Sequence, residues 1–528
     1  MPAPGTATAG CAAVGVATVR RHSTVGGKPT WYRNEPIDVP RARTVVGVVG
    51  LVSAVLAVAV GADFGVTGLS ASGATTVVPA NLKTAATLVG PITTGHIVPP
   101  LSANPTGLAA NDYVEQEFFA SGSATAFRAT ASPSDGKWSI TPTTEAAYRT
   151  RIIVRRPKDP AHFNGTVVVE WMNESAGESA PDWDYLNPQL MRQGYAYVAV
   201  SAQAVGVNGG TPILGSAQAG TSGGLVGSEP ARYGTLHHPG DQYANDMFAQ
   251  IGTALRAPKG AVLGGLHPKH VVAVGESQSA FFLTTFADAF QPRTDTFDGI
   301  FIHSRGGTGA ALDGASITSD KGAASVRIRT DLKVPVFMFE TQTDLITLGF
   351  AAAQQPNTDR IRTWEVAGTS HADAYEVGAA IGVLGCTTPV NNGPQHIVVQ
   401  AAFTAFNTWV DGGAAPPSPP PFRLSGTDPP TLALDANGNV VGGVRTPAVD
   451  APVSTLSGAA PAGANLLCSL FGSATPFDQD KLVGLYHTKA GYLTAYRARL
   501  DQAIDRGFIL KADRSELLAQ AGQVGFPS

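Results

Sequence analysis

The sequence predicts an α/β protein built on a mostly parallel, doubly wound sheet. Between residues 111 and 413, short runs rich in Val, Ile and aromatic residues alternate with longer segments of helical character. The runs are almost continuously apolar, which is typical of parallel strands that helices cover on both faces. Gly and Pro, with 60 and 38 residues in the chain, mark the turns between these segments.

The expected strands share β-branched or alternating apolar residues. In order they are "YVEQEFFASGSATAFRA", "AYRTRIIVRRP", "GTVVVEWMN", "YAYVAVSAQ", "HVVAV", "FDGIFIHS", "VPVFMFE" and "IRTWEVAG". The expected helices show apolar residues at helical spacing and include "DYLNPQLMRQG", "GDQYANDMFAQIGTALRA", a segment that ends near Phe290, and "QHIVVQAAFTAFNTWVDGG".

Composition divides the chain into four parts. Residues 1–62 form an N-terminal extension, and residues 63–110, rich in Ala, Thr and Pro, are expected to be a linker or lead-in. The α/β core is expected over 111–413. In 414–528 a Pro-rich connector precedes an Asn-Gly hairpin signal and two or three helices. We expect this C-terminal extension to pack on the core, as a cap or as part of a pocket wall.

Residues 45–62 form an unbroken apolar run preceded by Arg41 and Arg43 and closed by small residues, the pattern of an export signal. A run of this length can also just span a bilayer, so a retained membrane anchor is the alternative. About 40 residues precede the run, more than an ordinary signal carries, and a start near Val39 would account for them. We expect a secreted or cell-envelope protein, with membrane attachment only if the run is not cleaved.

Charge and cysteine content restrict the partners. The net charge is -4 and no long basic run is present, so a nucleic-acid partner is not expected.

The chain has three cysteines, of which Cys11 would leave with the signal. Cys386 and Cys468 are then expected to form a disulfide, the alternative being two unrelated buried thiols. Three scattered cysteines do not indicate a zinc site.

The segment Gly275-Glu276-Ser277-Gln278-Ser279 lies between an expected strand and an expected helix. It has the outline of a nucleophile elbow, G-x-S-x-G, with serine in place of the last glycine. Such a turn exposes the serine oxygen and places the next N–H at a helix N-terminus, where the dipole favours a developing oxyanion. The alternative is an ordinary helix N-cap.

Two downstream segments favour catalysis. Asp344 follows the expected strand "VPVFMFE", and His371 follows the next one, "IRTWEVAG". The order Ser277, Asp344, His371 places all three after strands, where catalytic groups gather in open α/β sheets. Glu340 is the alternative acid. His303 also follows a strand but precedes the acid.

The oxyanion hole requires two N–H donors. We expect the Gln278 backbone to supply one and the loop "EWMNESAGESAPDW" the other, from Asn173 or Glu174. Further side chains are expected to shape the pocket or support it: Glu276, Trp183, Tyr185, His303 and Arg305.

Several longer blocks, "GESQSA", "GYAYVAVSAQAVGV", "WEVAGTSHAD" and "LCSLFGSATPF", resemble a family of large, mostly bacterial α/β-hydrolase-domain proteins. The resemblance runs from about residue 110 to the C-terminus. It implies an α/β-hydrolase fold and, by position, the roles of Ser277 and His371. In the acid loop this chain has Gln342 where relatives have an acidic residue, so Asp344 and Glu340 both stay open.

We therefore expect a secreted serine hydrolase that cleaves a small or polymeric carboxylic ester through a Ser-His-Asp triad, with no metal or organic cofactor. An acyltransferase, in which another alcohol resolves the acyl-enzyme, is the first alternative. A non-catalytic envelope or binding protein with the same fold is the second.

Overall fold

The computed structural model of the protein describes residues 82–101, 107–214, 223–318, 324–383, 385–427, 429–461 and 463–526. Contacts divide the chain into two units, Met1–Ser70 and Ala71–Ser528, and all described residues belong to the second. The expected export signal at 45–62 and Cys11 lie outside them. Within the described ranges, no helix combines the length and the apolar character needed to cross a membrane.

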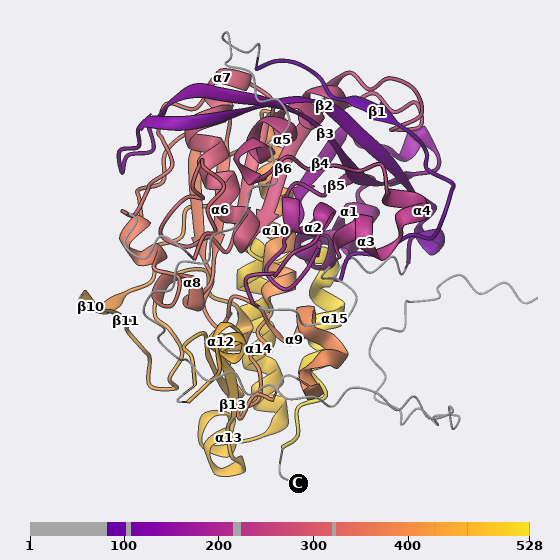
Figure 1. The fold of residues 1–528 in the computed structure, drawn as a ribbon. Coiled ribbons are helices and arrows are strands. Elements are labelled where there is room, and N and C mark those ends of the chain that lie inside the picture. The colour runs from indigo at the N-terminus through magenta and orange to yellow at the C-terminus, as the bar shows by residue number, and fades with distance from the viewer. Residues whose placement is uncertain are drawn as a thin grey trace, which may run out of the picture. The chain divides into compact units, whose positions relative to one another are not determined.

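The described residues form one large sheet of nine strands (Figure 1). Its strands, in spatial order, are β1 (Thr87–Val89), β2 (Tyr113–Ala131), β3 (Ser139–Pro157), β5 (Ala196–Val200), β4 (Thr166–Trp171), β6 (His270–Glu276), β7 (Gly299–His303), β8 (Val336–Glu340) and β9 (Ile361–Glu365). From β5 to β9 every neighbouring pair is parallel. The pairs from β1 to β5 are antiparallel. The predicted mostly parallel α/β sheet is confirmed.

The antiparallel edge begins earlier in the chain than the sequence indicates. β2 and β3 are each 19 residues long and pair along most of their length as a hairpin. β1 pairs with β2, with Thr87 opposite Ser121. The segment expected to be a linker or lead-in thus contributes a strand, which no apolar alternation in its Ala/Thr/Pro-rich sequence announces.

Helices cover both faces of the sheet. α5 (Ala244–Arg256) and α6 (Gln278–Thr285) pack on one face, and α1 (Pro181–Arg192) and α10 (Gln395–Val410) on the other. Residues alternate between the two cores along β4, since Val169 and Trp171 join the first and Val168 the second. Because both faces are buried, the strands are apolar almost throughout.

The remaining helices and strands are short or belong to the C-terminal region. They are α2 (Ala204–Asn208), α3 (Gly224–Ser228), α4 (Pro230–Tyr233), α7 (Gln291–Thr294), α8 (Gln342–Ile346), α9 (Ala374–Val377), β10 (Leu424–Thr427), β11 (Pro430–Leu432), α11 (Pro447–Asp450), β12 (Ser454–Ser457), α12 (Leu466–Leu470), β13 (Ser473–Pro476), α13 (Gln479–Tyr486), α14 (Lys489–Asp505) and α15 (Arg514–Ala521).

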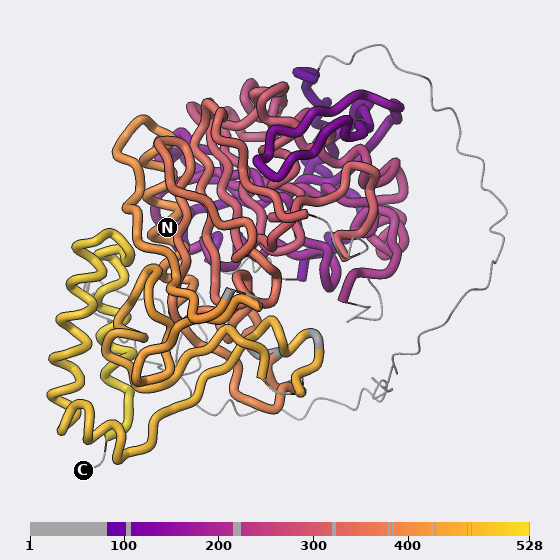
Figure 2. Tube along the Cα trace, turned by 90° about the vertical axis from the view of Figure 1, so that its left-hand side faces the viewer, coloured from indigo at the N-terminus to yellow at the C-terminus, as the bar shows by residue number. Residues whose placement is uncertain are grey.

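The C-terminal region packs on the second face. Figure 2 shows its last helices, in yellow, at one side of the unit. Leu500 of α14 and Leu517 of α15 share a buried cluster with Ile397 of α10. The predicted Asn-Gly hairpin is also present, since Leu434 and Val440 bridge across Asn437-Gly438 in antiparallel fashion.

The expected disulfide is confirmed. Cys386 and Cys468 are joined with an S–S distance of 2.08 Å and a Cα–Cα distance of 5.6 Å. The bond connects the chain after α9 to α12, so it ties the region after His371 to the C-terminal extension.

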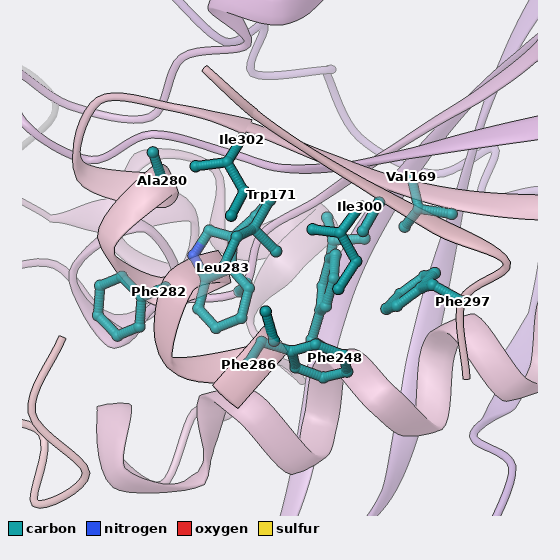
Figure 3. Close-up of a cluster of buried hydrophobic side chains, with 14 of the residues drawn as sticks. Val169, Trp171, Phe248, Ala280, Phe282, Leu283, Phe286, Phe297, Ile300 and Ile302 are labelled. Carbon is teal, nitrogen blue, oxygen red and sulfur yellow. The ribbon is translucent and has the colours of Figure 1, made fainter. Parts of the chain in front are cut away.

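Trp171 occupies the centre of the first core, where the sheet meets α5 and α6 (Figure 3). Its ring is fully buried and lies 4.8 Å from that of Phe282 and 4.9 Å from that of Phe248. Truncation would leave a cavity that rigid neighbours cannot fill.

We expect Trp171→Ala to lower the free energy of unfolding by about 3–5 kcal/mol. Denaturant titration followed by circular dichroism measures this change. Leu434→Ala, at a side chain 60% exposed, serves as the control and should change stability by no more than about 0.5 kcal/mol. An unfolding midpoint for Trp171→Ala equal to that of the wild type would contradict the assignment of this core.

Candidate active site

Ser277 lies in the tight turn between β6, which ends at Glu276, and α6, which begins at Gln278. Its backbone has φ 57° and ψ −120°, a region that residues other than glycine rarely adopt. Such strain is concentrated at functional sites. The Ser277 N–H donates to the His303 carbonyl at 2.9 Å, which ties the turn to the neighbouring strand β7.

The residues around Ser277 are small because strand and helix approach closely. A Cβ on Gly275 would lie 2.9 Å from Leu283 Cδ1 and 3.0 Å from Ser279 Cβ. Ser279, in the position of the usual glycine, is completely buried. Its small side chain fits the space between the two elements, so the departure from G-x-S-x-G does not distort the turn.

His371 lies between Ser277 and Asp344. Its Nε2 is 2.7 Å from Ser277 Oγ, and its Nδ1 is 2.6 Å from Asp344 Oδ1. The structure thus brings together the three residues that the order along the sequence selects. Ser277 is half-buried, whereas His371 and Asp344 are buried. A serine hydroxyl, an imidazole and a carboxylate in this chain of contacts can transfer the serine proton to the imidazole.

Asp344 is fixed at the start of α8, in a capping box. Its Oδ2 accepts the Thr341 N–H at 2.7 Å, and the Thr341 hydroxyl accepts the Asp344 N–H at 3.4 Å. The first carboxylate oxygen remains directed at His371. Glu340, the alternative acid, makes no hydrogen bond to His371 in the described part of the chain. Burial and the nearby Asp344 raise the pKa of Glu340, and Arg305 opposes this rise.

The expected oxyanion donors differ in availability. Gln278 is the first residue of α6, and its backbone N–H has no acceptor among the described residues. The Asn173 N–H does not face the site, because it donates to the Ser179 carbonyl at 2.9 Å. The Glu174 N–H donates to Gln278 Oε1 at 2.7 Å, beside the elbow. Of the two N–H groups expected from this loop, that of Glu174 is the one directed at an elbow residue.

Asn173 has a different position from the one expected. Its side-chain Nδ2 lies 3.1 Å from the Glu276 carbonyl oxygen and 3.3 Å from Glu276 Oε2, and its Oδ1 accepts the Ser175 N–H at 2.7 Å. The side chain holds the loop after β4 against the end of β6.

Two of the expected pocket residues lie in the interior. Trp183 packs under the Arg155 guanidinium at 4.3 Å and is fully buried. Arg305 is equally buried and donates to the carbonyls of Gly306 and Val326. These contacts are those of structural residues, and they favour a supporting role for both side chains over a role in shaping the pocket. The position of Arg305 after a strand, or of Trp183 in the loop after β4, does not by itself reveal whether the side chain turns inward.

Tyr185 and His303 belong to a polar cluster in the interior. The Tyr185 hydroxyl lies 3.3 Å from both Asp373 Oδ1 and Glu376 Oε2, and His303 Nδ1 lies 2.9 Å from Asp182 Oδ1. Burial raises the pKa of Asp373 to about 7. Burial, reinforced by Asp373, raises that of Glu376 to about 8.

The C-terminal extension holds both loops of the site, which the sequence did not indicate. Gly458 accepts a hydrogen bond from the Thr343 hydroxyl at 2.6 Å and donates its N–H to Gln342 Oε1 at 2.8 Å. The Ala372 N–H, next to His371, donates to the Leu470 carbonyl at 3.2 Å. The Gln342 side chain thus connects the acid loop to the extension through this hydrogen bond. No local spacing in the sequence relates positions so far apart in the chain.

Two cavities lie outside the triad itself. One, of about 320 Å³, lies against the outer strand β9 and contains none of the three residues. The other, of about 40 Å³, is lined by Glu174 and Gly177 of the loop after β4 and by apolar residues that include Val98 and Leu225.

We expect Gly458→Ala to slow modification of Ser277 by a fluorophosphonate at least tenfold, because the new Cβ would lie 2.5 Å from Gln342 Cβ, 2.7 Å from the Thr343 nitrogen and 2.8 Å from the Thr369 carbonyl. The rate of labelling measures the effect. Gly484→Ala, in α13 with nothing within 4 Å of the added carbon, is the matched control. Equal labelling rates for both variants would contradict a role for this contact.

The chain is only distantly similar to solved structures. No curated protein is significantly similar to the chain. A dienelactone hydrolase from Klebsiella pneumoniae, described as putative, is 13% identical with a TM-score of 0.29, and the match covers 56% of this chain and 98% of that protein. A CE15 glucuronoyl esterase from Teredinibacter turnerae is 13% identical with a TM-score of 0.26, covering 55% and 76%. A fungal esterase from Rhizomucor miehei is 12% identical with a TM-score of 0.28, and the match covers 59% of this chain and 87% of that protein.

The family comparison extends over most of the chain. Residues 88–519 match the Alpha/beta hydrolase domain family that the resemblance of the sequence blocks indicates. The match includes the elbow, both loops of the site and nearly all of the C-terminal extension. The chain belongs to this alpha/beta hydrolase family.

Proposed function

We propose that the protein is a serine hydrolase that cleaves carboxylic esters. The observation that carries this proposal is the position of His371, 2.7 Å from Ser277 Oγ and 2.6 Å from Asp344 Oδ1. Ser277 attacks the acyl carbon while its proton passes to His371 Nε2. The imidazolium then protonates the departing alkoxide, which leaves an acyl-enzyme that water resolves by the same steps.

Asp344 orients the imidazole and stabilises its charged form. Its second oxygen is held by the Thr341 N–H, so the carboxylate does not rotate away from His371. The Gln278 and Glu174 N–H groups bind the oxyanion of the tetrahedral intermediate. Because Gln278 Oε1 accepts the Glu174 N–H in the structure, substrate oxygen takes the place of that amide oxygen during turnover.

Export is part of the proposal. The apolar run at 45–62, with Arg41 and Arg43 before it, directs the chain out of the cytoplasm. The Cys386–Cys468 disulfide supports an oxidising compartment, where such bonds persist. N-terminal sequencing of the exported protein shows whether the run is removed.

We expect the wild type to react with a fluorophosphonate and to hydrolyse nitrophenyl esters, because Ser277 is activated by His371. Ser277→Ala should abolish labelling and reduce hydrolysis by about 10⁶-fold or more. Ser279→Ala, two residues away, is the matched control and should retain labelling. A folded wild type that neither labels nor hydrolyses would contradict the enzyme assignment and favour the binding-protein alternative.

We expect Asp344→Asn to lower kcat by about 10⁴-fold, because an amide at this position cannot hold the imidazole tautomer or stabilise its charge. Glu340→Gln should retain far more activity. Rates with one nitrophenyl ester measure both variants. If Glu340→Gln abolished turnover and Asp344→Asn did not, the acid would be Glu340.

A further inference from the structure

A second carboxyl group lies beside the catalytic imidazole. Glu276, the residue before Ser277, has its Oε1 3.6 Å from His371 Nε2. Both side chains are only 4% exposed, so solvent screens their interaction weakly. The 3.6 Å separation exceeds a hydrogen bond and lies within ion-pair range. Glu276 thus approaches the same nitrogen that receives the serine proton.

Other contacts of Glu276 leave this oxygen directed at the imidazole. The Asn173 amide lies 3.3 Å from the second oxygen, Oε2, and no described residue donates a hydrogen bond to Oε1. The Ser277 hydroxyl, at 2.7 Å, is much closer to Nε2 than Oε1 is. The proton on Nε2 therefore faces Ser277 and the leaving group, and Glu276 lies beside that path.

We propose that Glu276 is a positioning residue of the reaction, whose ionised carboxylate stabilises the His371 imidazolium from the Nε2 side while Asp344 does so from the Nδ1 side. This inference rests on the proposed function. Glu276 takes no proton from substrate or serine. The serine proton moves to Nε2 as the Oγ–acyl bond forms, and then to the leaving oxygen as the ester bond breaks. Glu276 acts through the positive charge present between these two transfers.

The charged surroundings set the pH at which Glu276 acts. Burial is the main cause that raises the pKa of Glu276, and neighbouring carboxylates from four elements add to it: Glu376 of α9, Asp182 of α1, Asp344 of α8 and Glu170 of β4. Further titratable groups near it are the Tyr185 phenol, His371 and His303, which lies opposite Glu276 on the neighbouring strand β7. Because the pKa is raised, Glu276 ionises above the usual range of a glutamate. Its stabilising charge is gained as the pH rises.

The experiment is the pH profile of kcat and kcat/KM for nitrophenyl ester hydrolysis by Glu276→Gln. Glutamine keeps the shape and an acceptor for Asn173 but carries no charge. We expect kcat to fall about tenfold with KM nearly unchanged, since the lost charge acts only on the imidazolium. The acidic limb of the pH profile should also have its midpoint about one pH unit lower than in the wild type. The reason is that the Glu276 carboxylate raises the pH at which the Glu276–His371 pair loses its proton.

Two further variants separate charge from structure. Glu276→Asp keeps the carboxylate and should restore part of kcat and return the limb toward the wild-type pH. Glu365→Gln removes a comparably buried carboxyl at the end of β9 and should leave the limb in place. Should Glu276→Gln fold poorly, Glu276→Asn and Glu276→Asp give the same comparison, since they have the same shape and only the second carries the charge.

Superimposable profiles of wild type and a folded Glu276→Gln would overturn the inference, as would a loss confined to KM. An inactive wild type would instead contradict the proposed function. The two failures are therefore distinguishable.

Discussion

The close approach of α6 to β6 at Ser277 is the constraint on which the rest of the site depends. Gly275 and Ser279 have no room for larger side chains, and Ser277 adopts a backbone conformation that few residues tolerate. This turn raises the hydroxyl above the sheet and leaves the Gln278 N–H without a backbone partner. In the proposed reaction, substrate attack and oxyanion binding both depend on this one geometry.

The parallel order of the sheet supplies the other two residues. β6, β7, β8 and β9 are adjacent and all end at the same edge, so loops from distant parts of the chain converge there. Asp344 comes from the loop after β8 and His371 from the loop after β9. Convergence also places many carboxyl groups in one buried region. Burial raises the pKa values of Glu276, Asp373 and Glu376, and neighbouring carboxylates raise those of Glu276 and Glu376 further.

Much of the fold and the site could be predicted from the sequence, for physical reasons. Parallel strands buried on both faces are apolar throughout, so β4 to β9 are recognisable. Ser277, Asp344 and His371 follow strands, and topology brings such positions together. The inward turn of Trp183 and Arg305 could not be predicted, because it depends on partners from other strands. The same holds for the Asn173 N–H, which bonds within its own loop, and for β1, which pairs with β2. Both depend on contacts that leave no periodic pattern in the sequence.

The C-terminal extension contributes to the candidate site. Gly458, Leu470 and the disulfide at Cys468 hold the loops that carry Asp344 and His371, although the sheet is complete at Glu365. The last helices rest on α10 of the core. The proposed reaction therefore depends on contacts that extend beyond the sheet and its flanking helices into the C-terminal extension. A change to the extension near Gly458 or Leu470 is therefore also a change to the surroundings of Asp344 and His371.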